Sequence, residues 1–141
     1  MATEEEVLVL AANDAFYAAF DAEDAAAMDR LWATEAPCAC IHPGWDPLVG
    51  RSAVIEAWSR ILSGGRAPSI RVDSARVLVY GEVAVVLCVE HVTQRGGPGA
   101  ALLAATNVFV RQAGDWRISH HHAGPVSQSD DDPSVPPEKL N

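Results

Sequence analysis

The sequence has few positively charged residues. Its 10 Lys and Arg residues stand against 19 Asp and Glu residues, which gives a formal net charge of −9 at pH 7. The basic residues are scattered along the chain, whereas a surface that binds nucleic acid needs clustered Lys and Arg to neutralise phosphates. We therefore expect no nucleic-acid partner.

Membrane and export signals are also lacking. No apolar run approaches the ~20 residues of a membrane-spanning helix, and the N-terminus is acidic where a signal peptide would be basic. The three cysteines are an odd number, and two of them, Cys38 and Cys40, lie too close along a predicted strand to bridge comfortably. We expect buried, reduced thiols in a cytoplasmic protein that has no membrane segment.

The hydrophobic content, in contrast, is ample. A chain of 141 residues, 49% of them hydrophobic, is large enough for one domain with its own core. The helical spacing of apolar residues predicts a first helix over residues 3–20 and a short second helix capped by Asp21 or Asp24. A third helix is predicted between Gly50 and Gly64.

Strand signals dominate the second half of the chain. The predicted strands span residues 37–41, 69–80, 83–94, 101–110 and 116–123. The second and third of them flank Gly81-Glu82, a two-residue hairpin turn. Helices followed by long strands predict an α+β domain over residues 1–125, with an acidic tail rich in Pro and Ser over residues 126–141.

Both faces of the predicted sheet are largely apolar. Alternation along the strands groups His91, Asn107 and His121 on one face of the sheet, with no carboxylate beside them, and one of the two faces must pack on the helices. The opposite face cannot stay in water as a hydrophobic patch, so we expect a second copy of the chain to cover it across a two-fold axis. On the last strand, this predicted homodimer surface comprises Trp116, Ile118, His120 and His122.

Four short motifs in the chain resemble one known superfamily. They are Phe16-Tyr17-Ala18-Ala19-Phe20 followed by Asp24, Ile41-His42-Pro43-Gly44, Gly50-Arg51-Ser52-Ala53-Val54-Ile55 with Trp58, and Gly114-Asp115-Trp116-Arg117-Ile118 before three histidines. Over residues 3–125 they resemble the NTF2-like (cystatin-like α+β) superfamily and its SnoaL-like members. The resemblance implies a cone of three N-terminal helices packed on a strongly curved, mostly antiparallel sheet, with an internal pocket and no cofactor.

Two groups within that superfamily imply where a site would lie. Relative to ketosteroid isomerases, the catalytic-base aspartate falls at His42, the oxyanion tyrosine at Phe16 and the oxyanion aspartic acid at Asn107. Phe16 cannot donate a hydrogen bond, which argues against steroid isomerisation. The pocket arginines of the similar calcium/calmodulin-dependent kinase II association domain fall at His91, Asn107 and Ala123, so carboxylate binding through arginine is not implied. Both comparisons imply that His91, Asn107 and His121 face inward, while His120 and His122 face the partner copy.

The candidate catalytic residues are therefore His42, His91 and Asn107. An unperturbed histidine has a pKa of ~6.5 and can exchange a proton near neutral pH, while an amide N–H of Asn107 can stabilise an oxyanion. Each also has a structural alternative, as a loop or core group held by hydrogen bonds. The candidate substrate-binding residues are Phe16, Trp45, Asp46, Trp58, Phe109 and His121.

The three consecutive histidines at 120–122 do not predict a metal site, because neighbours on a strand point to opposite faces.

Two functions remain open. One is an enzyme that binds a hydrophobic, carbonyl-bearing small molecule and acts by proton transfer, as an isomerase, cyclase or dehydratase. The alternative is a non-catalytic ligand-binding or dimeric assembly module of the same fold.

Overall fold

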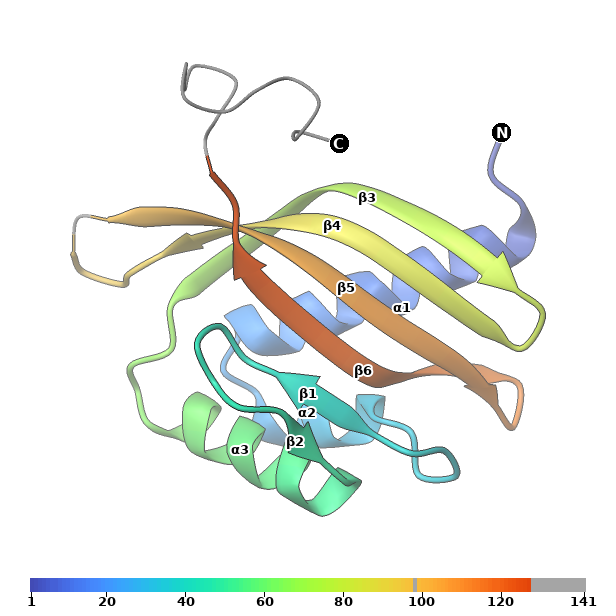
Figure 1. Cartoon of the computed structure of the whole chain (residues 1–141), viewed down its shortest axis with the longest axis horizontal. Coiled ribbons are helices and arrows are strands. Elements are labelled where there is room, and N and C mark those ends of the chain that lie inside the picture. The colour runs from blue at the N-terminus through green and yellow to red at the C-terminus, as the bar shows by residue number, and fades with distance from the viewer. Residues whose placement is uncertain (98, 128–141) are drawn as a thin grey trace.

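The chain folds into three helices that lie on one side of a curved sheet (Figure 1). The computed structural model describes residues 1–97 and 99–127. The helices are α1 (Glu4–Asp21), α2 (Ala25–Leu31) and α3 (Arg51–Ser63). The strands are β1 (Ala39–Ile41), β2 (Leu48–Val49), β3 (Ser69–Tyr80), β4 (Val83–Thr93), β5 (Ala100–Gln112) and β6 (Asp115–Pro125).

The six strands form one sheet in the order β2-β1-β6-β5-β4-β3. Neighbouring strands are antiparallel except for β1 and β6, which are parallel. The predicted α+β class with a mostly antiparallel sheet is thus confirmed. Strand β2 adds to the predicted set, since two residues offer no periodicity to detect. The expected tail over residues 126–141 lies outside the described residues from position 128 onward.

Side-chain caps mark where α1 and α2 begin. Thr3 Oγ1 accepts the Glu6 N–H at 3.1 Å and the Glu6 carboxylate accepts the Thr3 N–H at 3.1 Å, which is a reciprocal capping box. Asp24, rather than Asp21, caps α2 by accepting an N–H of its first turn at 3.0 Å. Asp21 instead accepts the Ile70 N–H at 2.9 Å and so ties the end of α1 to the beginning of β3.

The interior between α1 and the sheet is filled by aromatic rings. Phe16 on α1 is fully buried, and its ring lies edge-on to those of Trp32 and Trp58, with centroids 6.5 Å and 5.5 Å away. Such edge-to-face contacts are a favoured packing of aromatic side chains. Phe109 on β5, 1% exposed, belongs to the same core.

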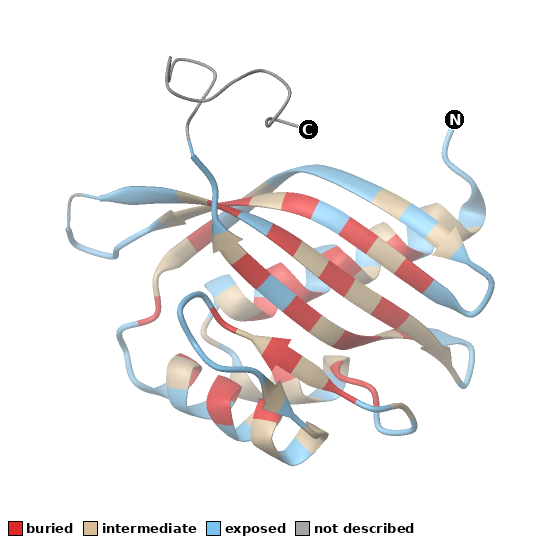
Figure 2. Cartoon of the chain, in the orientation of Figure 1, coloured by how far each residue is buried: buried red, intermediate tan, exposed pale blue. Residues whose placement is uncertain are grey.

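The side chains of β4 alternate in the sense opposite to the predicted one (Figure 2). The residues buried against the helices are Ala84, Val86, Cys88 and Glu90. Leu87 is 41% exposed on the other face, where His91 lies 2.7 Å from the Asp73 carboxylate. The prediction that His91 faces inward is therefore wrong. Hydrophobicity could not choose between the two sets, because apolar residues dominate both.

Strand β6 changes face at a β-bulge. Its pairing with β5 shifts by one residue at Ser119, which is the extra residue of the bulge. Trp116 and Ile118 consequently lie on the helix side, 8% and 1% exposed. The prediction that Trp116 and Ile118 belong to the outer surface is wrong. The other two members of the predicted homodimer surface, His120 and His122, do lie on the outer face.

The bulge yields a test of this arrangement. Deleting Ser119 would force one half of β6 onto the wrong face of the sheet. We expect the deletion to lower the free energy of unfolding by more than ~3 kcal/mol, as when large core side chains are lost. Ser119→Ala keeps the residue count and removes one long hydrogen bond to the Val108 carbonyl (3.4 Å), so it should cost less than ~1 kcal/mol. Urea unfolding measures both, and a deletion variant as stable as the wild type would contradict this role.

Candidate functional site

A cluster of polar side chains lies in the interior between α1 and the sheet. Its members are Asn13 and Tyr17 on α1, Glu90 on β4, Asn107 on β5 and His121 on β6, and their exposures run from 0% to 6%. Polar groups buried this deeply need hydrogen-bond partners, because an unsatisfied one costs ~1–3 kcal/mol. The cluster members provide most of these partners for one another.

Asn107 is the centre of the cluster. Its Nδ2 donates to Asn13 Oδ1 at 2.9 Å and to Tyr17 Oη at 3.0 Å, and its Oδ1 accepts from His121 Nδ1 at 2.6 Å. This assigns the tautomer of His121, in which Nδ1 carries the proton and Nε2 carries a lone pair. Both amide hydrogens of Asn107 are engaged in this arrangement, in which Asn107 orients His121; the oxyanion role of Asn107 stays a prediction.

Glu90 places a carboxyl group in this interior. Tyr17 Oη donates to Glu90 Oε2 at 2.6 Å, and His121 Nε2 lies 3.8 Å from the same oxygen. Burial raises the pKa of Glu90 to about 7, against a smaller lowering by the Tyr17 hydrogen bond. The expectation that no carboxylate faces inward is wrong, and Glu90 and Tyr17 are site residues that the sequence reasoning missed.

His42 lies beside the cluster, directly after β1. Its ring centroid is 4.7 Å from that of Trp58, 4.8 Å from Trp45 and 6.4 Å from His121, while its Nε2 is 3.6 Å from Cys40 Sγ. Burial lowers the pKa of His42 to about 4 and that of His121 to about 3. Both imidazoles are therefore neutral at pH 7, the form in which histidine can accept a proton.

The turn after β1 covers His42. Trp45 in this turn is 45% exposed, whereas His42 against it is 5% exposed. Asp46 lies exposed in the same turn, and the Trp45 N–H donates to the His42 carbonyl at 2.9 Å. Access to the imidazole therefore requires the Trp45 turn to move.

Most of the predicted site residues do converge on this interior. Those around the cluster are Phe16, His42, Trp58, Asn107 and His121. Phe109 packs in the core, Trp45 and Asp46 lie in the covering turn, and His91 is on the opposite face of the sheet. The structure thus brings His42 and His121 together but separates both from His91.

Five buried nitrogen atoms have no hydrogen-bond partner within the described part of the chain, and two of them, on His91 and Arg111, lie within ion-pair distance of a carboxylate. The other three have neither kind of partner. They are the indole Nε1–H groups of Trp32 and Trp58 and the Asn13 amide Nδ2. Trp58 is 1% exposed, and its ring lies beside those of His42 and His121, with centroids 4.7 Å and 5.9 Å away. A buried donor without an acceptor is a place where a ligand oxygen or a water can bind. The interior therefore offers N–H groups to an oxygen.

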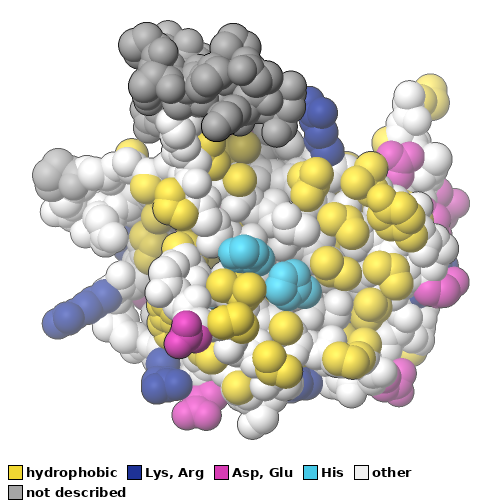
Figure 3. All heavy atoms as spheres, in the orientation of Figure 1, with side chains coloured by type: hydrophobic (Ala, Val, Ile, Leu, Met, Phe, Trp, Pro, Cys, Tyr) yellow, Lys and Arg dark blue, Asp and Glu magenta, His cyan; other side chains and the backbone are white. Residues whose placement is uncertain are grey.

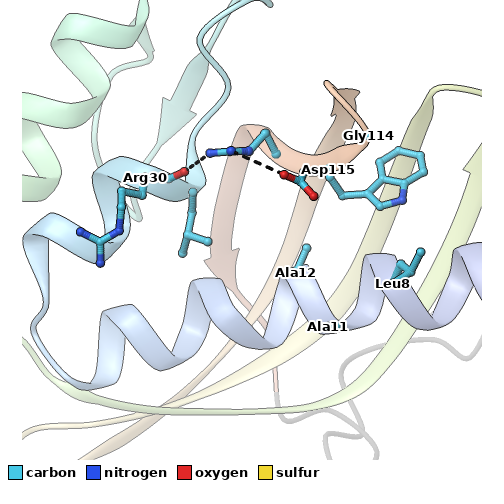
Figure 4. Close-up of a pocket in the computed structure, with 9 residues that line it drawn as sticks. Leu8, Ala11, Ala12, Arg30, Gly114 and Asp115 are labelled. Carbon is cyan, nitrogen blue, oxygen red and sulfur yellow. Dashed lines mark hydrogen bonds and ion pairs between the residues drawn. The ribbon is translucent and has the colours of Figure 1, made fainter.

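An open hollow lies elsewhere on the surface. A groove of about 360 Å³ runs between α1, α2 and the β5–β6 turn, where Leu8, Ala11 and Ala12 face Arg30 and Asp115 (Figure 4). Its lining is separate from the polar cluster.

Within residues 1–97 and 99–127, no group of three or more His, Cys, Asp or Glu side chains is placed to hold a metal ion. None of the described helices is long and apolar enough to cross a membrane.

Comparison with known proteins adds to this geometry. The profile of a family described as SnoaL-like domain matches residues 9–127. Among curated proteins, the F-box protein SKIP8 from Arabidopsis thaliana is 26% identical over 115 residues, which are 82% of this chain and 48% of that protein. The chain therefore spans about half the length of this relative.

Solved structures agree on the fold. A proposed dehydratase of the NTF2-like family from Streptomyces avermitilis has a TM-score of 0.80 and 34% identity, over 86% of this chain and 95% of that one. A proposed calcium/calmodulin-dependent protein kinase type II association domain from Thiobacillus denitrificans has a TM-score of 0.74 and 33% identity, and the match covers 84% of this chain and 94% of that one. A ketosteroid isomerase-like protein from Erwinia carotovora atroseptica has a TM-score of 0.71 at 18% identity, and the match covers 89% of this chain and 99% of that one. The predicted NTF2-like fold is confirmed.

Replacing Glu90 by Gln should change how stability depends on pH. Glu90 has a pKa of about 7 in the folded protein and ~4.3 in the unfolded chain. Between these two pH values, the folded state binds more protons than the unfolded state. The stability that the Glu90 proton contributes is therefore complete below the unfolded pKa and is lost as the pH rises through the folded pKa. We expect the free energy of unfolding of Glu90→Gln, relative to the wild type, to rise by ~2–3 kcal/mol between pH 5 and pH 8.

Urea unfolding at several pH values measures this difference. His42 titrates in both proteins, so its contribution cancels when the two curves are subtracted. Glu56→Gln, on the exposed side of α3, is the matched control and should show no pH-dependent difference. A difference between Glu90→Gln and the wild type that stays constant with pH would contradict a raised pKa.

Proposed function

The chain belongs to the family of SnoaL-like domains, and from this membership and its interior site we propose that it is a cofactor-independent enzyme. It binds a hydrophobic small molecule that bears a carbonyl group and acts on it by proton transfer, as an isomerase, cyclase or dehydratase. Because one fold serves many functions, the argument for this reaction has to come from the site.

The observation that carries the proposal is the unpaired indole N–H of Trp58 beside the neutral imidazole of His42. A ligand carbonyl oxygen accepts a hydrogen bond from Trp58 Nε1, and the carbon next to the carbonyl then lies near the imidazole. When His42 removes a proton from that carbon, negative charge develops on the oxygen. The Trp58 hydrogen bond strengthens as the charge grows, so it stabilises the transition state more than the bound substrate.

The environment of His42 suits it to act once the site opens. Its pKa is lowered because it is buried. Movement of the Trp45 turn rehydrates the imidazole and returns its pKa toward the ordinary ~6.5, where it is an effective base near neutral pH. The rings of Phe16 and Trp58 supply apolar walls, and Asn107 holds His121 in one orientation.

The relatives support the same class of reaction. One at 34% identity is named as a proposed dehydratase.

Cys38, Cys40 and Cys88 are free and buried in the structure, which supports our placing the protein in the reducing cytoplasm.

We also propose that two copies of the chain pair through the outer face of the sheet. Leu78, Tyr80 and Leu87 on this face are 45%, 63% and 41% exposed. Figure 3 shows hydrophobic side chains spread over the face, around two neighbouring histidines. The rings of His120 and His122 lie there with centroids 6.5 Å apart. Apolar side chains exposed over one surface favour burial against a second copy. A relative at 33% identity is named as a proposed association domain.

The enzymatic proposal can be tested without knowing the natural substrate. Hydrophobic cyclic ketones are incubated with the protein in D₂O, and proton NMR follows exchange of the hydrogens next to the carbonyl. We expect the wild type to accelerate exchange of at least one ketone. His42→Ala should lower that rate by ~10²–10⁴-fold through loss of the base. Trp58→Phe keeps a ring but loses the N–H, and should lower it by ~10²-fold.

Glu56→Gln on α3 is the control and should exchange at the wild-type rate. A wild-type rate in His42→Ala would refute the assignment of the base. If the wild type exchanges none of the ketones, the non-catalytic binding module becomes the better description.

The dimer proposal has a separate test. Leu87→Lys places a charge in the middle of the proposed interface, where its burial is unfavourable, and should convert the dimer to a monomer in sedimentation velocity. The control is Val7→Lys on α1, which replaces an apolar residue that is 55% exposed on a different surface and should leave the dimer intact. A wild-type protein that sediments as a monomer would refute the proposal.

A further inference from the structure

Within residues 1–97 and 99–127, no Lys or Arg side chain lies in ion-pair contact with the buried carboxyl group of Glu90. The titratable groups that face it are Tyr17 from α1, His121 from β6, and the thiols of Cys88 on β4 and Cys40 on β1. Among the described residues, His121 is the one base placed within 4.0 Å of the carboxyl group. An unpaired carboxylate in such surroundings is costly. The cluster is therefore most stable when one proton resides on Glu90 or on His121.

The directions of the hydrogen bonds leave one position for that proton. Tyr17 accepts from Asn107, so its own hydroxyl hydrogen is donated to Glu90 at 2.6 Å. His121 donates its Nδ1–H to Asn107 at 2.6 Å, so the lone pair on its Nε2 is directed away from Asn107, and this atom is 3.8 Å from Glu90 Oε2. With the Tyr17 hydroxyl hydrogen donated to Glu90, the Cys88 thiol, whose Sγ lies 3.4 Å from Tyr17 Oη, is the donor in that contact, so the hydrogens of the other bonds are assigned. The remaining one belongs between the Glu90 carboxyl and His121 Nε2.

This pair of groups lies next to the proposed ligand position. The ring centroid of His121 is 5.9 Å from that of Trp58 and 5.0 Å from that of Phe16. An oxygen that accepts from Trp58 Nε1 is thus among the rings that also surround His121. His42, the proposed base, has its centroid 6.4 Å from that of His121. These rings are packed against one another, so a small molecule enters among them only if they separate; it would then contact a base on one side and a proton donor on another.

We propose that Glu90 and His121 share one exchangeable proton, and that His121 Nε2 delivers it to the oxygen of the bound carbonyl compound. This role rests on the function proposed above. His42 takes the proton from the carbon next to the carbonyl, and the electron pair of that C–H bond forms the C=C bond of an enol. The carbonyl oxygen accepts the proton released by His121, so Glu90 is left as the carboxylate and His42 as the imidazolium. Charge is conserved within the interior, and the reverse transfers restore both groups.

The shared proton can be observed directly by NMR of the whole protein, with ¹³C-labelled Glu carboxyl groups and ¹⁵N-labelled His rings. We expect Glu90 and His121 to titrate with one common midpoint near neutral pH, and Glu90→Gln to remove that midpoint from His121. Tyr17→Phe is the matched control, because it removes the other partner of Glu90 and keeps the shared proton; it should retain the common midpoint and shift it upward. A Glu90 carboxyl that ionises below pH 5, independently of His121, would overturn the proposal.

The role as an acid is tested in the ketone exchange assay. In the wild type, the exchange rate should fall as the pH rises above the common midpoint. Glu90→Gln should lower the exchange rate by ~10²-fold and abolish this fall. The thermal unfolding of Glu90→Gln at pH 5 should stay near that of the wild type. If His42→Ala abolishes exchange but Glu90→Gln keeps the wild-type rate and pH profile, the reaction stands and the acid assignment is overturned. If the wild type exchanges no ketone while the common titration is present, the proposed function and the acid role fall together and the shared proton stands.

Discussion

The amide group of Asn107 connects the layers of this molecule. From the middle of β5 it bonds to Asn13 and Tyr17 on α1 and to His121 on β6, at 2.6–3.0 Å. Within the closed interior these side chains satisfy one another where water would otherwise do so, so each bond depends on the others being made. Helix α1 cannot slide on the sheet without leaving several polar groups unpaired. The same bonds that hold the fold therefore fix the ring of His121 and place Tyr17 against Glu90.

The bulge at Ser119 allows one strand to serve both the core and the site. In a regular strand, Ile118 and His121 would face opposite sides, because they are an odd number of residues apart. The extra residue brings both to the helix side, where Ile118 packs in the core and His121 joins the polar cluster. It also leaves His120 and His122 on the outer face. One additional residue thus sets the composition of two surfaces.

Much of this arrangement could be predicted from the sequence, because it depends on local signals. Thr3, Asp24 and the Gly81-Glu82 turn mark the helix starts and the first long hairpin, and the motif around His42 placed it near Asn107 and His121. The faces of β4 could not be predicted, since apolar residues occupy both. A glutamate is ordinarily exposed, which made Glu90 a surface residue by default.

Tyr17 did carry a usable signal. It lies one turn after Asn13 on α1, so both point in the same direction, and two polar residues on an otherwise apolar helix face indicate a buried polar partner. The bulge had no comparable signal, because Ser119 is neither glycine nor proline and nothing in its neighbours marks an extra residue. Register in this part of the sheet is decided by tertiary packing of Trp116 and Ile118.

The shortness of β1 and β2 has a consequence for how fast a ligand would reach the proposed site. These strands have three and two residues, whereas β3 to β6 have 11 to 13. Local unfolding begins where the fewest backbone hydrogen bonds must break, so the amide hydrogens of Cys40 and Ile41 should exchange with solvent well before those of β4 and β5. His42 follows directly on the segment that opens first, and Glu90 and His121 lie on strands that open last. The opening of the segment before His42 and the hydrogen bonding of Glu90 and His121 are therefore governed by separate parts of the fold, and mutations can alter either one alone.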